Sequence, residues 1–104
     1  MAQQRRVSEA TTPEDDFEVG EVVADIYCDS LHISTGLYSS TLYLGVSQPG
    51  KKDKLLARVR VSPQMLRAIS LLAGKHVKEY QEAVGPINLP AQMVRNWGLE
   101  EGTK

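Results

Sequence analysis

Hydrophobic and polar residues alternate along three segments between Val19 and Val61, and this two-residue period predicts a small β-sheet. The first segment runs from Val22 to Ser34, and its apolar residues change parity near Asp29. A change of face within one strand predicts a bulge or bend at that point. The apolar positions of this segment are Ala24, Ile26, Cys28, Leu31 and Ile33.

The second and third segments predict an antiparallel hairpin. Residues 40–47 alternate apolar and polar side chains, and the Pro, Gly and charged residues of 48–53 predict a turn before the third strand. In that third strand, alternation puts one group of residues on each face of the sheet. Leu55, Ala57, Val59 and Val61 share one face, whereas Leu56, Arg58 and Arg60 share the other.

A long amphipathic helix is predicted directly after the third strand. Ser62 suits the N-cap because its hydroxyl accepts from a free first-turn amide, and Pro63 suits the first helical position. Gly85 and Pro86 predict the stop, and Pro90 opens a predicted short helix from Ala91 to Trp97. One apolar stripe recurs at spacings of three and four: Met65, Leu66, Ile69, Leu72, Ala73, Val77, Tyr80 and Val84.

These elements predict an α+β fold, in which a three-stranded antiparallel, meander-like sheet precedes one long helix and a short C-terminal tail. We expect a disordered polar tail over 1–18, which is either a solvated leader or an interaction arm. The β-β-β-α domain is expected over 19–87, with the C-terminal tail over 88–104. Three strands and one helix leave one sheet face uncovered, so self-association is expected. The residues expected on that face are Tyr43, Leu56 and either Tyr27 or Tyr38.

Composition narrows the class of protein. The chain has 104 residues, 41% of them hydrophobic, and a formal net charge of −1, so no global charge attracts nucleic acid. Cys28 is the single cysteine, which suits a reducing cytosol. No apolar stretch follows Arg5 and Arg6 and no run has the length of a membrane span. We therefore expect a cytoplasmic protein without a secretory signal or membrane insertion.

No grouping of residues indicates catalysis. His32 and His76 lack a second ligand at metal-site spacing, and His76 is interpreted as a packed or interface histidine. Cys28 is interpreted as a small buried strand residue rather than a nucleophile. The chain contains no glycine-rich phosphate-binding motif. We expect no enzyme activity, cofactor or metal.

The strand-to-helix junction from Arg58 to Pro63 suggests an alternative function. Ribbon-helix-helix repressors begin with a strand, a Ser-Pro or Ser-Glu cap and a helix, and paired strands of their dimers enter the major groove. Arg58 and Arg60 would then contact DNA. That fold needs a second helix after a turn, whereas here the apolar stripe continues through residues 74–77.

The chain also resembles a small prokaryotic family, domain of unknown function 3467, over about Val22 to Leu89. The residues that carry the resemblance are Tyr27, Ser30, the junction Val59-Arg60-Val61-Ser62-Pro63-Gln64, Tyr80, Gly85 and Ile87. Members often have an aromatic-acidic second strand, from which residues 37–44 depart. The resemblance implies the fold and brings no activity and no catalytic residue.

The leading interpretation is a non-enzymatic domain that self-associates, as a dimer or larger homo-oligomer, and serves as a scaffold or accessory subunit with another protein. Trp97 either packs on its own domain or covers a neighbouring subunit, and with Leu99 it is interpreted as a docking tail. The predicted interface consists of Tyr43, Met65, Leu66, Ile69, Leu72, His76, Tyr80, Trp97 and Leu99.

Overall fold

The computed structural model describes residues 13–99. Its elements are a 3-10 helix, η2 (Pro13–Asp16), the strands β1 (Ser30–Thr35), β2 (Ser40–Val46) and β3 (Lys54–Val61), and the helices α1 (Pro63–Ala83) and α2 (Ala91–Trp97). By contacts the chain divides into two units. Of the described residues, 13–74 belong to one unit, with the sheet and the first half of α1, and 75–99 belong to the other. The predicted tail over 1–18 lies mostly outside the described residues.

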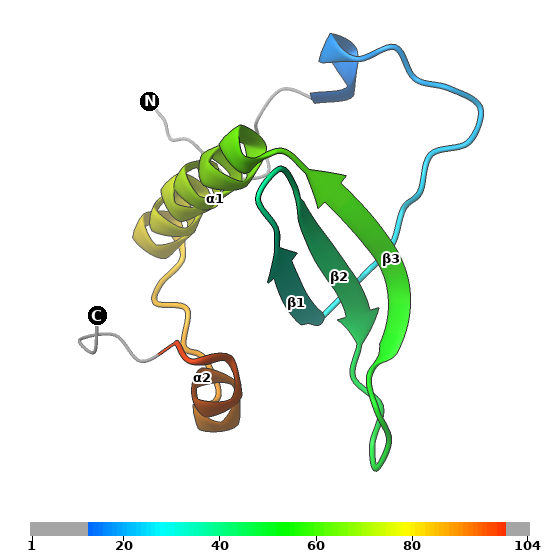
Figure 1. Cartoon of the computed structure of the whole chain (residues 1–104). Helices are drawn as coiled ribbons and strands as arrows, with labels where there is room; N and C mark the ends of the chain where they lie inside the picture. The colour runs from blue at the N-terminus through cyan, green and yellow to red at the C-terminus, as the bar shows by residue number, and fades with distance from the viewer. Residues whose placement is uncertain (1–12, 100–104) are drawn as a thin grey trace. The chain divides into compact units, whose positions relative to one another are not determined.

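The three strands form one antiparallel sheet in the order β1-β2-β3, with β2 in the middle (Figure 1). This confirms the predicted α+β class, the meander and the hairpin between the second and third strands. Two edges of the sheet, on β1 and β3, have no strand beside them in the described chain. Such edges offer unpaired backbone groups to a further strand.

The first strand is shorter than predicted. β1 begins at Ser30, and Val22–Asp29 are not part of any strand. The apparent change of face near Asp29 is therefore the start of the strand and not a bulge within it. Tyr27 precedes β1 and Tyr38 lies in the turn between β1 and β2, so neither residue belongs to a sheet face, contrary to our expectation.

The bulge lies instead in β3. Leu44 is opposite Ala57 while Gly45 is opposite Leu55, so Leu56 is an extra residue in the ladder. An extra residue reverses the parity of the strand beyond it. Leu55 consequently lies on the side of Gly45, and its predicted place beside Ala57 is wrong.

The long helix begins as the sequence predicts. The amide of Met65 donates to the Ser62 hydroxyl over 3.1 Å, and the amide of Leu66 donates to the Ser62 carbonyl over 2.9 Å. At the other end the amide of Ile87 donates to the Gln81 side-chain oxygen over 3.1 Å, just past Gly85. The short helix predicted after Pro90 also forms, over Ala91–Trp97.

Candidate functional site

One face of the sheet is entirely apolar along its middle. The register sets Leu31 opposite Leu44 and Ile33 opposite Leu42 across β1 and β2. Directly opposite residues point to the same face, so the ladder joins these side chains into one surface. The apolar face is defined by Leu31, Ile33, Leu42, Leu44, Ala57, Val59 and Val61. Thr35 and Ser40 share the end row of Val61, and Val46 and Lys54 form the row at the other end.

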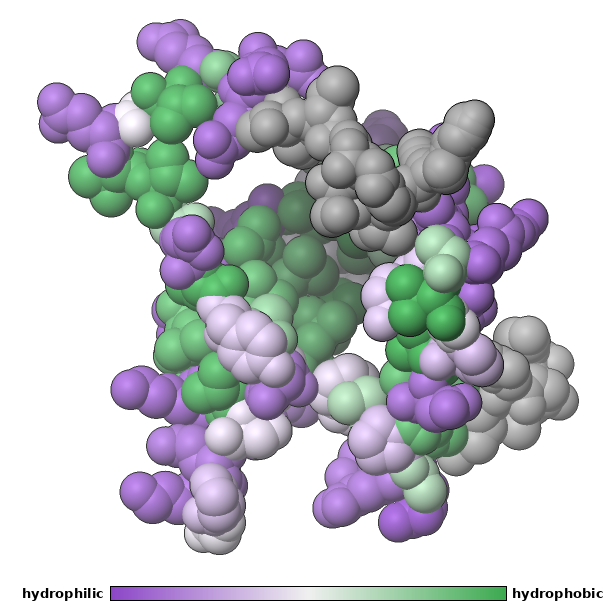
Figure 2. Space-filling view, turned by 180° about the vertical axis from the view of Figure 1, so that it is seen from behind, coloured by the Kyte–Doolittle hydropathy of each residue, from purple (hydrophilic) through white to green (hydrophobic). Residues whose placement is uncertain are grey.

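None of the hydrophobic residues in the described part of the chain is buried. On the apolar face Ile33 is 50% exposed and Val59 is 40% exposed, and the central Leu42 and Leu44 are half-buried. Figure 2 shows hydrophobic side chains, in green, open to view in the middle of the molecule. Seven clustered apolar side chains, none of them fully buried, are typical of an interaction surface.

The opposite face is polar and basic. His32 is opposite Tyr43, and Tyr43 is opposite Arg58, so three side chains form a row across the three strands. Thr41 is opposite Arg60 in the next row. The sequence predicted that Arg58 and Arg60 share one strand face. The register adds Tyr43 and His32 to that face, and the sequence analysis assigned His32 no role.

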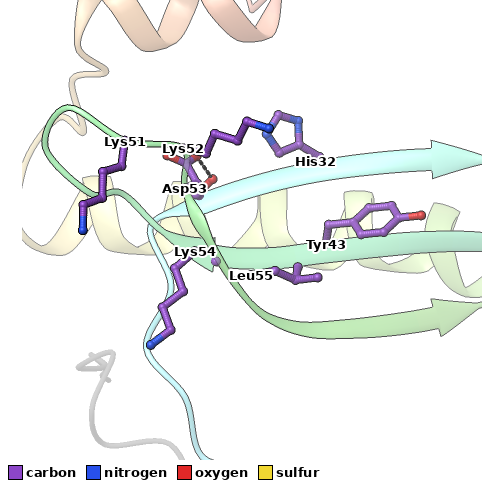
Figure 3. Close-up of a pocket in the computed structure, with 9 residues that line it drawn as sticks. His32, Tyr43, Lys51, Lys52, Asp53, Lys54 and Leu55 are labelled. Carbon is purple, nitrogen blue, oxygen red and sulfur yellow. Dashed lines mark hydrogen bonds between the residues drawn. The ribbon is translucent and has the colours of Figure 1, made fainter.

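A cleft of about 430 Å³ opens at the hairpin end of this polar face. It is lined by Ser30, His32, Tyr43, Gly45, Lys51, Lys52, Asp53, Lys54 and Leu55. Figure 3 shows the Lys52 side chain extending from the hairpin loop toward the His32 ring, with Tyr43 further along the sheet.

The hairpin loop beside the cleft is held by several hydrogen bonds. The buried Ser30 hydroxyl donates to the Asp53 carboxylate, and the amide of Ser47 donates to the Asp29 carboxylate over 2.9 Å. Within the loop, the side-chain amide of Gln48 donates to the carbonyl of Lys52 over 2.8 Å. The two lysines on the rim, at positions 51 and 52, therefore project from a loop with a defined backbone.

The predicted stripe on α1 is also unburied. Met65 is 51% exposed and Leu72 57% exposed, whereas Leu66 and Ile69 are half-buried. Further along, Tyr80 is 40% exposed. The helix therefore has an apolar stripe available for a contact beyond the described chain.

Two other predicted contact regions lie in the second unit. The Nδ1 atom of His76 is 3.5 Å from a carboxylate oxygen of Glu79, one turn on. Trp97 is half-buried and Leu99 is 39% exposed, and the amide of Leu99 donates to the Val94 carbonyl at the end of α2. Their roles as an interface histidine and a docking tail stay predictions.

Cys28 differs from its prediction. It is half-buried and precedes β1, so it is not the buried strand residue that we expected.

Among residues 13–99 no three side chains of the metal-binding types gather into one site. In the same residues, none of the helices has the length and apolarity that crossing a bilayer requires.

Comparisons of this chain with family models, with curated proteins and with solved structures found no match. The resemblance to domain of unknown function 3467 therefore stays a prediction.

Proposed function

We propose that this chain is a non-enzymatic, self-associating domain that serves as a scaffold or accessory subunit, and that a second copy covers its apolar sheet face. The observation that carries the proposal is the apolar face itself, which groups seven hydrophobic side chains and buries none of them. A three-stranded sheet needs a covered hydrophobic face to be stable in water. The cover must therefore come from outside the sheet.

The magnitude of the missing burial favours association. Complete burial of one aliphatic side chain contributes roughly 1.5–3 kcal/mol. Residues such as Ile33 and Val59 leave about half of their surface in water, so covering each would contribute about 1 kcal/mol. Summed over the face, the gain is several kcal/mol per subunit, which is comparable to the whole stability of a small domain.

A second copy suits this surface for two reasons. Two-fold association brings identical patches together, so an apolar face on one subunit meets an apolar face on the other. Facing sheets pack through the side chains of their inner faces, which in the middle rows here are aliphatic and uncharged. The exposed stripe of α1 adds a second hydrophobic surface on each subunit, from which a larger assembly would follow.

Adjacent residues on β1 provide a matched test. Ile33 lies on the apolar face and Ser34 lies on the polar face, and both are exposed. Ile33→Asp and Ser34→Asp introduce the same residue one position apart. We expect Ile33→Asp to shift the mass of the full chain, measured by light scattering, toward the monomer and to lower its melting temperature. Ser34→Asp should keep the wild-type mass, and an Ile33→Asp variant with wild-type mass and stability would count against the proposal.

A DNA-binding regulator of ribbon-helix-helix type is the alternative. Arg58 and Arg60 support it because both lie on the polar face of an edge strand. The unbroken course of α1 over Pro63–Ala83 counts against it, since that class of regulator divides this region into two helices. Self-association therefore has the stronger support.

A further inference from the structure

The polar face of the sheet carries a second, independent surface. Its two full rows are His32, Tyr43 and Arg58, then Ser34, Thr41 and Arg60. The strand register alone brings them together, because His32 and Arg58 are separated by the whole hairpin in sequence. The surface thus has one aromatic ring at its centre and planar groups on both sides of that ring.

The hairpin end of this face opens into the cleft. The row of Ser30, Gly45 and Leu55 lines the cleft there, and the backbone of β3 lies close against Gly45. Lys51 and Lys52 line the same cleft from the hairpin loop. Lys51 and Lys52 therefore lie at one end of the polar face, and Arg58 and Arg60 lie further along it.

The charge of this region differs from that of the whole chain. Residues 30–61 contain five Lys and Arg and one Asp, a net charge of +4, whereas residues 13–29 contain seven Asp and Glu and no basic residue. The overall charge of −1 conceals this separation. Two carboxylates lie beside the hairpin, and both accept hydrogen bonds: Asp53 from the buried Ser30 hydroxyl and Asp29 from the Ser47 amide. The sheet and its hairpin thus form a cationic surface that complements a polyanion.

We propose that this polar face binds single-stranded nucleic acid. An unpaired base would stack on Tyr43, while Lys52, Arg58 and Arg60 would contact phosphates on either side. Single strands are bound by basic surfaces with aromatic side chains on which bases stack, and a β-sheet is a common platform for such stacking. The half-buried Tyr43 would supply that ring. A duplex hides its bases inside the stack, so it would not use the central tyrosine.

The binding test uses the full chain and a fluorescein-labelled oligothymidylate, with fluorescence anisotropy at several salt concentrations. Tyr43→Leu should weaken binding by about tenfold or more, and Tyr43→Phe should retain it because the ring is preserved. Arg58→Gln with Arg60→Gln should weaken binding and reduce the salt slope by roughly 1.4, since each lost phosphate contact removes about 0.7.

Matched controls separate this surface from general electrostatics. Arg67→Gln with Lys75→Gln removes the same charge from α1 and should leave the affinity and salt slope nearer to wild type. A duplex of the same length should bind more weakly than the single strand. Equal binding of the duplex, equal effects of the two double variants, or wild-type affinity of Tyr43→Leu would overturn the proposal.

Mass and circular dichroism of each variant complete the test. Tyr43→Leu is expected to keep the wild-type mass and spectrum, which would assign its loss of affinity to stacking. A change of mass would show that Tyr43 belongs to a subunit interface, as the sequence predicted, and would also overturn the proposal. This result is independent of Ile33→Asp, which reports on the opposite face.

Discussion

Replacing Gly45 by alanine tests the β3 bulge. Gly45 lies at the register shift, where the extra residue of β3 brings the opposite backbone close. A Cβ atom added there would collide with the carbonyl oxygen of Lys54. It would also lie 3.2 Å from the Lys54 carbonyl carbon and 3.5 Å from the Leu55 Cα. All three atoms belong to the backbone, so no side-chain rotation relieves the contact.

The expected cost follows from this geometry. Forcing an extra carbon into a tightly packed position costs about 1–3 kcal/mol, because the neighbouring backbone must shift. For a domain of this size each kcal/mol corresponds to a change of roughly 4–8 °C in melting temperature. We therefore expect Gly45→Ala to lower the melting temperature by about 10 °C.

Gly74 provides the matched control for this prediction. It lies within α1, and a Cβ atom added there meets nothing within 4 Å. Alanine at an open helical position is favoured over glycine by roughly 1 kcal/mol, so Gly74→Ala should raise the melting temperature by about 5 °C. Both variants should be melted by circular dichroism at one protein concentration, because association shifts the transition. A Gly45→Ala variant as stable as wild type would refute the bulge geometry.

Three further changes test other parts of the structure. Ser62→Ala should lower the free energy of unfolding in urea by about 1 kcal/mol, because the Met65 amide loses its hydrogen bond to the Ser62 hydroxyl. Asp53→Ala should lower the free energy of unfolding by about 1–3 kcal/mol, because it leaves the buried Ser30 hydroxyl without a partner. Adding Ser30→Ala should recover part of that loss. Equal stabilities of the single and double variants would contradict this. Ile69→Asp should lower the mass of the assembly measured by sedimentation, whereas Ser70→Asp, one position off the stripe, should not. An unchanged mass for Ile69→Asp would show that this helix is not part of the interface.

The helix and the hairpin were predictable because their signals are local. Ser62 and Pro63 define the start of α1, and the alternation of β2 needs no knowledge of its neighbours. The start of β1 was not predictable from alternation, because a strand exists only where an adjacent strand accepts its hydrogen bonds. β2 ends at Val46, opposite the beginning of β1, so the alternating residues before Asp29 have no partner to pair with.

The two surfaces were predictable only in part. The stripe of α1 follows from spacing, and the placement of Arg58 and Arg60 on one face follows from parity. Their neighbours Tyr43 and His32 follow from the register, which no local pattern specifies. The bulge at Leu56 inverts the face of Leu55, and β3 itself contains no glycine that would signal it. The one signal lies on the opposite strand, where Gly45 permits the close approach of the β3 backbone.

The central claim is that the apolar sheet face is covered by a second copy of the chain. The most direct test is the mass of the full-length protein by sedimentation equilibrium over a wide dilution series, with circular dichroism on the same samples. The account predicts a mass of at least twice 11.5 kDa, and loss of structure wherever dilution separates the subunits. A monomer of 11.5 kDa that unfolds in one cooperative transition would contradict it.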